Sequence, residues 1–217
     1  MAQITSTSTF REKGSKFMGH LFPVKNKDQF EERLDELKSK YPDATHHCYA
    51  WRINPVELEE FAQDDGEPGG TAGLPILNQL KSYDAINTGI IVVRYYGGTN
   101  LGKSGLIEAY GRSAELCLDQ TNLKEIQLIQ KVEISYPYSE QNTIEQWIHQ
   151  FELKEIESVY LENVTLVLGC PQKKADAFLE TVRKSAHLGI EANILKKDYL
   201  YIIISRRIGY VQAKEMK

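Results

Sequence analysis

Cysteine is scarce in this sequence. The three cysteines, Cys48, Cys117 and Cys170, lie far apart and form no C-x-x-C pair. A disulfide framework usually has an even set of thiols, and a zinc ribbon needs closely spaced pairs, so the pattern disfavours both. We expect the three thiols to be small buried side chains of the hydrophobic core.

Long apolar runs and an excess of positive charge are also lacking. No apolar run reaches the roughly 18 residues of a membrane helix. The polar beginning of the chain has no apolar stretch typical of a signal peptide. These features predict a cytoplasmic protein with no membrane partner. The net charge of −4 argues against a strongly basic nucleic-acid binder, so DNA is not an expected partner.

The rest of the composition is that of a globular protein. With 217 residues and 41% hydrophobic side chains, the chain can form one large domain or two small ones. An amphipathic pattern from about Phe30 predicts a helix that ends before Pro42. In the same part of the chain we predict two strands within 4–24 with a turn near Lys13-Gly14, strands over 45–53 and 87–96, a short helix over 74–83 with Pro75 in its first turn, and a helix after residue 105.

The pattern changes near residue 125. Strands are predicted over 128–136, 153–160, 163–169 and 199–205, with helices carrying the apolar positions Ile144 to Phe151 and Ala175 to Ala186. The order β-α-β-β-α-β is that of a ferredoxin-like arrangement. We therefore predict an α+β protein of two domains, residues 1–125 and 126–217.

The segment GGTNLGKS, residues 97–104, matches the G-x-x-x-x-G-K-[ST] pattern of a phosphate-binding P-loop. It follows a hydrophobic strand and precedes a helix, as a P-loop does. However, no later strand offers a Walker-B aspartate and no parallel β-α units precede the loop, which disfavours a nucleotide hydrolase. The weaker hypothesis is that N–H groups at the helix start bind an anion.

A second glycine-rich loop, DDGEPGGTAG, spans residues 64–73. Its acids Asp64, Asp65 and Glu67 could hold a divalent cation or serve acid–base chemistry. Alternatively, they accept hydrogen bonds from neighbouring N–H groups in a tight turn. The glycines indicate that another segment or a partner approaches this backbone closely.

The run His46-His47-Cys48 lies on a predicted strand, where His46 and Cys48 share one face and His47 points away. A zinc site needs three or four ligands, and no further ligand is close in sequence. A Cys/His nucleophile pair would lack a visible orienting residue. Burial in the fold is therefore the favoured interpretation, and no cofactor or metal is predicted.

Three segments together carry a family resemblance. ATHHCYAW, DDGEPGGTAGLPIL and VVRYYGGTNLGKSGLIEAYG, in this order, resemble the signature of the YigZ/IMPACT family of translation-associated proteins. The resemblance covers about residues 10–120, and the C-terminal pattern resembles the extra domain of bacterial members. It implies an N-terminal domain with the left-handed β-α-β fold of the second domain of ribosomal protein S-five. It also implies a C-terminal ferredoxin-like domain similar to the last domain of elongation factor G.

The chain departs from the family pattern GG-x-K-LG-x-GG-L-x-R-AYG at three positions. Asn100 stands where lysine is usual, Ser104 replaces a glycine, and Glu108 replaces an arginine. Two positive charges are lost and one negative charge is gained, a local change of −3, which weakens an RNA-binding role. The P-loop match depends on Lys103 and Ser104 and is interpreted as variation of this loop.

These observations leave three hypotheses for function. The resemblance implies a translation-associated regulatory protein that docks on a ribosomal or translation-factor protein without catalysis. One alternative is a direct RNA binder that uses the glycine-rich loops. The other is a nucleotide hydrolase or metal-dependent hydrolase.

We predict that the two glycine-rich loops are neighbours and form one shallow cleft, with Arg94 reaching it and the three acids on its rim. The alternative is that the loops only pack together and that Arg94 pairs with one of those acids. The predicted partner-binding or anion-binding residues are Asp64, Asp65, Gly66, Glu67, Gly69, Gly70, Thr71, Gly73, Arg94, Gly97, Gly98, Lys103, Ser104 and Arg112.

Overall fold

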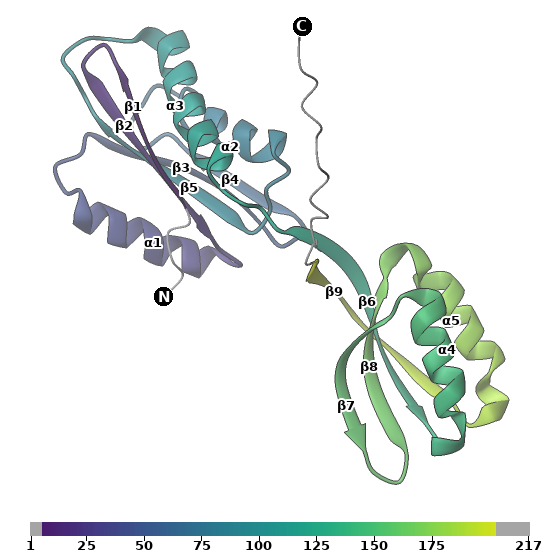
Figure 1. Ribbon diagram of the computed structural model, residues 1–217. Helices are drawn as coiled ribbons and strands as arrows, with labels where there is room; N and C mark the ends of the chain where they lie inside the picture. The colour runs from purple at the N-terminus through teal and green to yellow at the C-terminus, as the bar shows by residue number, and fades with distance from the viewer. Residues whose placement is uncertain (1–5, 203–217) are drawn as a thin grey trace, which may run out of the picture. The chain divides into compact units, whose positions relative to one another are not determined.

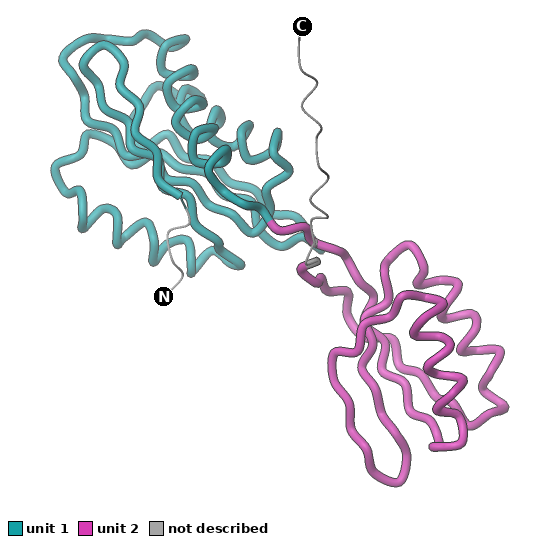
Figure 2. Tube along the Cα trace, in the orientation of Figure 1, with its two compact units in different colours: residues 1–123 teal, residues 124–217 magenta. Residues whose placement is uncertain are grey.

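The computed structural model describes residues 6–202 and divides the chain into two compact units, residues 1–123 and 124–217 (Figure 2). Each unit has one antiparallel sheet with helices packed against it (Figure 1). The α+β fold class predicted from the sequence is confirmed. No helix within residues 6–202 is long and apolar enough to cross a membrane.

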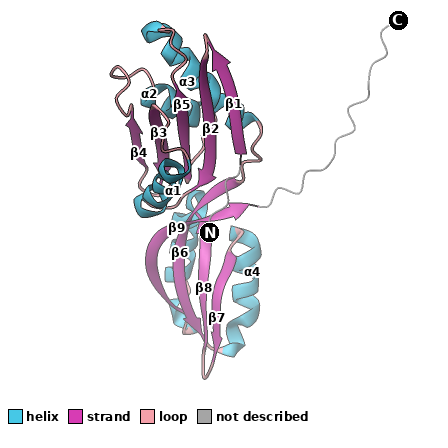
Figure 3. Ribbon diagram, turned by 90° about the vertical axis from the view of Figure 1, so that its left-hand side faces the viewer, coloured by secondary structure: helices cyan, strands magenta, loops and turns pink. Residues whose placement is uncertain are grey.

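The first unit is built on a five-stranded sheet in the order β1-β2-β5-β3-β4 (Figure 3). Each neighbouring pair in this order is antiparallel. The strands are β1 (Ser6–Glu12), β2 (Ser15–Pro23), β3 (His46–Ile53), β4 (Glu59–Gln63) and β5 (Thr88–Tyr95).

Helices cover both faces of this sheet. The helix α1 (Lys27–Lys40) lies on one face, and α2 (Gly73–Ser82) and α3 (Gly102–Asp119) lie on the other (Figure 1). The buried strand β5 serves both layers, because its side chains alternate. Ile91 and Val93 belong to the core beneath α1, whereas Ile90 and Val92 belong to the core beneath α2 and α3.

Local signals explain how several elements begin. Lys13 and Gly14 form the turn between β1 and β2 with φ of 45° and 84°, as a tight hairpin turn with the twist of its strands requires. The helix α1 begins after Asn26, whose side chain accepts a hydrogen bond from the N–H of Gln29 at 2.9 Å.

The second unit has a four-stranded sheet in the order β7-β8-β6-β9, the strand order of a ferredoxin-like fold. Side chains from both of its α-helices share one core with the sheet. The elements are β6 (Glu125–Tyr136), η1 (Tyr138–Glu140), α4 (Gln141–Phe151), β7 (Lys154–Tyr160), β8 (Val164–Pro171), η2 (Gln172–Lys174), α5 (Ala175–Lys184), η3 (Ala186–Leu188) and β9 (Glu191–Ile202).

Three elements differ from the sequence prediction. The strand β4 was not predicted, because its sequence EEFAQ is largely polar. This strand pairs only with β3, at the edge of the sheet. The helix α3 begins at Gly102, so Lys103 and Ser104 lie in its first turn rather than in the preceding loop. The strand β9 begins at Glu191, well before residue 199, and the predicted residues 203–205 lie outside the described part of the chain.

Candidate functional site

A buried ion pair joins the 64–73 loop to the strand that precedes the second predicted loop. Arg94, near the end of β5, directs its guanidinium to Glu67 in the loop between β4 and α2, with Nη1 and Oε1 2.5 Å apart. The side chains are only 5% and 4% exposed, respectively. Arg94 follows the alternation of Ile90 and Val92 and therefore reaches the side of the sheet covered by α2 and α3. The alternative considered from the sequence, a pairing of Arg94 with one of the three acids, is the arrangement that the structure adopts.

Further side chains complete the surroundings of this pair. Glu67 Oε1 also accepts a hydrogen bond from the Tyr110 hydroxyl of α3 at 2.7 Å, and His46 Nε2 lies 3.8 Å away. The Arg94 guanidinium lies 5.3 Å from the centre of the Phe17 ring and 5.4 Å from that of Tyr96. Aromatic faces attract a guanidinium, so the two rings add to the stabilisation of the buried cation.

Ser15 links the same cation to the third segment of the site. Its hydroxyl oxygen accepts hydrogen bonds from Arg94 Nη2 and from the N–H of Gly97, both at 3.2 Å. The β1–β2 turn, the 64–73 loop and the loop after β5 are thus all held around Arg94. We name the exposed part of the last two loops the glycine-loop surface; its members are Gly66, Pro68, Gly69, Tyr96, Gly97, Gly98, Thr99 and Asn100.

Asp64 caps the start of α2. Its Oδ1 accepts the N–H groups of Ala72 at 3.0 Å and Gly73 at 2.8 Å, and its Oδ2 accepts that of Gly70 at 2.8 Å. The start of α2 therefore already holds a carboxylate of the same chain. This is the second interpretation given above for the acids of this loop, in which they accept hydrogen bonds from neighbouring N–H groups.

Asp65 fastens the same loop to β3. Its Oδ2 accepts the N–H of His47 at 2.6 Å, and its backbone oxygen lies 2.7 Å from His46 Nδ1. Glu67 is buried rather than placed on a rim, because it pairs with Arg94. No group of three or more potential metal ligands gathers within residues 6–202. In the described structure, the three acids serve as acceptors for the protein's own donors.

The thiol of Cys48 is held inside this network. Its Sγ lies 2.9 Å from the backbone oxygen of Asp64 and 3.3 Å from the Tyr110 hydroxyl oxygen, and either oxygen can accept the single thiol proton. Burial raises the pKa of the Cys48 thiol above its ordinary value, and it also raises that of the Tyr110 phenol. Both groups stay protonated, which disfavours a nucleophilic role for Cys48. The prediction of three free, buried cysteines is confirmed.

Of the other predicted site residues, some are buried and some are exposed, and within residues 6–202 none joins the Arg94 network. Thr71 is buried, and its hydroxyl donates to the backbone oxygen of Pro68 at 2.6 Å. Lys103 and Ser104 are exposed in the first turn of α3. Arg112 lies further along α3 and pairs with Glu115 at 2.6 Å, so its guanidinium is used outside the Arg94 network.

Ser15, His46 and Tyr110 are members of the Arg94–Glu67 network that sequence reasoning did not assign to the site. Ser15 carries no charge and lies about eighty positions from Arg94 in the sequence. Tyr110 falls within the segment EAYG that carries the family resemblance, but its position there indicates only a buried helix face. No local pattern identifies these contacts, because they are formed by the packing of separate segments.

The P-loop interpretation lacks its structural setting. The strand β5 pairs antiparallel with both β2 and β3, whereas a P-loop lies at the end of a strand in a parallel sheet. Asn100 Oδ1 accepts the N–H of Gly102, the first residue of α3, at 2.9 Å. The departure from lysine at position 100 thus provides a hydrogen bond that helps to begin this helix.

Gly97 occupies a position that excludes any side chain. A Cβ added there would lie 2.0 Å from the carbonyl carbon of Gly14, whereas a Cβ at Gly69 would meet nothing within 4 Å. We expect Gly97→Ala to lower the free energy of unfolding by about 1–3 kcal/mol, because the turn at Gly14 must shift. Gly69→Ala, the matched control, should change it by less than about 0.5 kcal/mol. Urea unfolding of both variants tests this, and equal stabilities would contradict it.

Comparisons with known proteins place both units in one family. The family model of the Impact N-terminal domain matches residues 13–118, and that of a domain of unknown function, DUF1949, matches residues 134–184. IMPACT family member YvyE of Bacillus subtilis is 38% identical over 76% of this chain and 76% of its own length. IMPACT family member YigZ of Escherichia coli is 35% identical over 67% of this chain and 72% of its own length.

A solved structure is similar over most of the chain. The crystal structure of a hypothetical protein is 28% identical and covers 90% of this chain and 96% of that chain, with a TM-score of 0.61. The structure of the two-domain translational regulator Yih1 matches only in part: it covers 55% of this chain and 47% of that chain at 27% identity, with a TM-score of 0.38. On the strength of its bacterial relatives and its two domain matches, the chain belongs to the YigZ/IMPACT family.

Proposed function

We propose that this chain is a translation-associated binding protein whose glycine-loop surface docks on a ribosomal or translation-factor protein, without catalysis. The link to translation comes from the family to which the chain belongs. The choice of the surface comes from the Arg94 network, which holds both glycine-rich loops in place.

The observation that carries this proposal is the internal use of the reactive groups. Glu67 is shared by Arg94 and Tyr110, Asp64 caps α2, and burial raises the pKa of Cys48. A general base or a nucleophile has to reach a substrate with a free lone pair. A rigid frame of buried polar groups beneath exposed glycine backbone instead favours the recognition of a partner.

Tyr96 is the large side chain that this surface presents to solvent. Tyr96 is 51% exposed, and its ring lies beside the buried guanidinium of Arg94. An amphipathic ring held in one place is typical of the residues that contribute most to protein–protein interfaces. We therefore assign Tyr96 as the main contact of the glycine-loop surface.

Direct RNA binding has less support from the same residues. Near the loops, Lys103 is exposed, but Arg112 is paired with Glu115 and position 108 carries a glutamate. Affinity for RNA depends on the number of cations that neutralise phosphates. The departures from the family pattern therefore favour a protein partner.

The test is affinity capture from native lysate, with and without nuclease, followed by identification of the proteins retained. We expect a ribosomal protein or a translation factor to remain bound after nuclease treatment. Tyr96→Ala should reduce capture about tenfold, the loss typical of an interface residue of this kind. Leu161→Ala is the matched control, since Leu161 is also a large apolar side chain, 76% exposed, but lies in the second unit.

Two results would contradict the proposal. Loss of all translation proteins upon nuclease treatment would identify RNA as the direct ligand. Equal capture by the Tyr96→Ala and Leu161→Ala variants would show that the partner does not contact the glycine-loop surface.

A further inference from the structure

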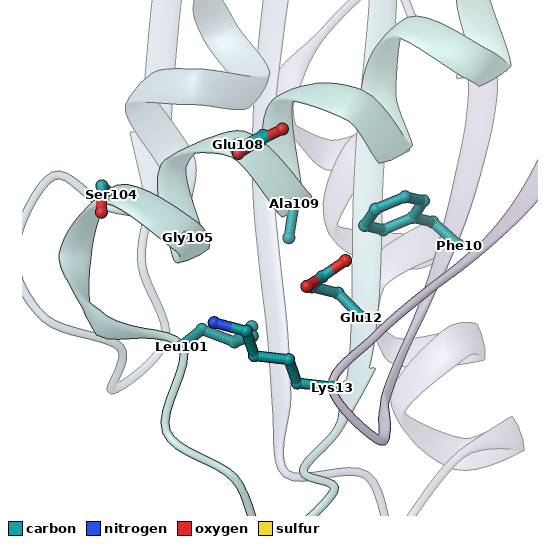
Figure 4. A pocket seen from close by; sticks show the side chains of 8 residues that line it. All are labelled: Phe10, Glu12, Lys13, Leu101, Ser104, Gly105, Glu108 and Ala109. Carbon is teal, nitrogen blue, oxygen red and sulfur yellow. The ribbon is translucent and has the colours of Figure 1, made fainter.

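A pocket of about 260 Å³ lies next to the Arg94 network, within the first unit. One wall comes from the end of β1 and its following turn, with Phe10, Glu12 and Lys13. The other wall comes from the beginning of α3, with Leu101, Ser104 and Glu108 (Figure 4). The pocket is therefore formed by two segments that lie about ninety positions apart in the sequence.

The charges of this pocket are not balanced internally. Glu12 and Glu108 are two carboxylates against the single ammonium of Lys13 among the residues that line it. Glu12 is half-buried, yet within residues 6–202 neither its carboxylate nor that of Glu108 forms a hydrogen bond or an ion pair. A carboxylate that is partly withdrawn from water without a partner is unfavourable until a cation or a donor reaches it.

An aromatic ring lies beside these carboxylates. Phe10 packs against the core beneath α2 and α3, with its ring centre 6.2 Å from that of Phe17, and part of it stays accessible. A cation attracted by carboxylates and placed against an aromatic ring is stabilised by both. This chemistry suits an ammonium or a guanidinium group, and it repels the phosphates of RNA.

The pocket adjoins the site already described. Glu12 pairs with Ser15 across the β1–β2 turn, and the Ser15 hydroxyl accepts hydrogen bonds from Arg94 and Gly97. We infer that this pocket takes a lysine or arginine side chain of the partner protein that docks on the glycine-loop surface. The inference rests on the proposed function and specifies the chemistry of the partner: a basic segment rather than an acidic one.

The first test uses a peptide as the probe. A hexapeptide of alternating lysine and glycine, acetylated only at its N-terminus, is titrated into the full chain. The reference is the same peptide with its lysine side chains acetylated as well. We expect binding of the lysine peptide and a loss of at least about tenfold for the reference, since acetylation removes the charge. Backbone amide shifts should change at Phe10, Glu12 and the start of α3.

Variants then assign the binding to the pocket. The double variant Glu12→Gln and Glu108→Gln should weaken binding about tenfold or more, because two charge-assisted contacts are lost. Lys13→Ala should strengthen binding several-fold, because it removes the competing cation. The charge-matched control is the double variant Glu32→Gln and Asp35→Asn, which also removes two carboxylates, since both residues are exposed on α1 at the opposite face of the sheet.

Several outcomes would overturn this inference. One is that the peptide with acetylated lysines binds as tightly as the lysine peptide. Another is that the double variant of Glu12 and Glu108 binds the lysine peptide as tightly as the unchanged chain does. A third is that the backbone amide shifts change only in other parts of the chain. Binding of hexauridylate at the same residues would also overturn it in favour of RNA.

Partner capture separates this inference from the proposed function. If the double variant of Glu12 and Glu108 captures the same translation protein as the unchanged chain does, the pocket is not the point of contact and the proposed function stands. If the lysine peptide binds in the pocket but no translation protein is captured, the proposed function fails on its own.

Discussion

Arg94→Ala is expected to lower the free energy of unfolding of the first unit by about 3–5 kcal/mol, the usual effect of removing one partner from a buried ion pair. The physical reason is that Glu67, whose side chain is 4% exposed, would remain buried without its cation. The hydrogen bond from Arg94 to Ser15 would be lost as well.

The measurement has to report on the first unit alone. Trp51 lies in the core beneath α1, and Trp147 lies in the core of the second unit. Urea unfolding followed by tryptophan fluorescence in a Trp147→Phe background therefore follows Trp51. Arg112→Ala is the matched control, because it breaks an exposed pair and should cost no more than about 0.5 kcal/mol.

The double variant Arg94→Met with Glu67→Leu shows whether the lost stability comes from the unpaired charge of Glu67 or from the missing side chain of Arg94. Replacement of both charges by apolar side chains of similar size leaves no buried charge unpaired, so it should recover much of the lost stability. A loss of less than about 1 kcal/mol for Arg94→Ala would show that the loops are held by other contacts.

Acidification is the second change with a large expected effect. His20 on β2 is buried under α1, with its ring 5.5 Å from that of Tyr41, and neither ring nitrogen has a hydrogen-bond partner within the described residues. Burial, together with the positive charge of Lys40 and the nearby His47, lowers the pKa of His20 from 6.5 to about 4. The pKa of His47 is lowered as well, mainly by its burial.

The direction of the effect follows from these pKa values. The folded first unit binds the proton of His20 less readily than the unfolded chain does, so the neutral form stabilises the fold. This contribution is fully present above pH 6.5 and is lost as the pH falls from 6.5 toward 4. One pKa unit corresponds to about 1.4 kcal/mol, so acidification from pH 6.5 to 4 should lower the free energy of unfolding of the first unit by about 3 kcal/mol.

The same Trp51 signal, recorded between pH 7 and pH 4, gives the measurement. His20→Leu should flatten the decline of stability with acidification, whereas His187→Gln, at an exposed histidine of the second unit, should leave it unchanged. An equally steep decline in the His20→Leu variant would assign the pH dependence to other groups.

Much of the fold can be predicted from local patterns. The Ile and Val run of β5 and the spacing of Phe30, Leu34 and Leu37 in α1 each identify their element, because burial imposes the period of the structure on the sequence. The strand β4 cannot be predicted in this way, since an edge strand with exposed side chains needs no alternation of apolar residues. The α-β order of the second unit follows from patterns of the same kind.

The site is less predictable than the fold. The acids and glycines of the 64–73 loop attract attention by composition, but whether Asp64 binds a metal or caps a helix depends on where the N–H groups of Ala72 and Gly73 lie. Likewise, Arg94 is recognisable as an unusual charge at the end of a buried strand, but its partners Glu67 and Ser15 come from two other segments. These contacts are decided by tertiary packing.

The contact between Gly14 and Gly97 has a consequence for the evolution of such chains. A Cβ at Gly14 would lie 2.9 Å from the Gly97 carbonyl oxygen, and a Cβ at Gly97 would lie even closer to the backbone at Gly14. No exchange of one side chain for another at these two positions can compensate, because each position opposes backbone rather than a side chain. Methods that infer proximity from correlated substitutions would therefore fail to detect this contact, although it fixes how the β1–β2 turn meets the loop after β5.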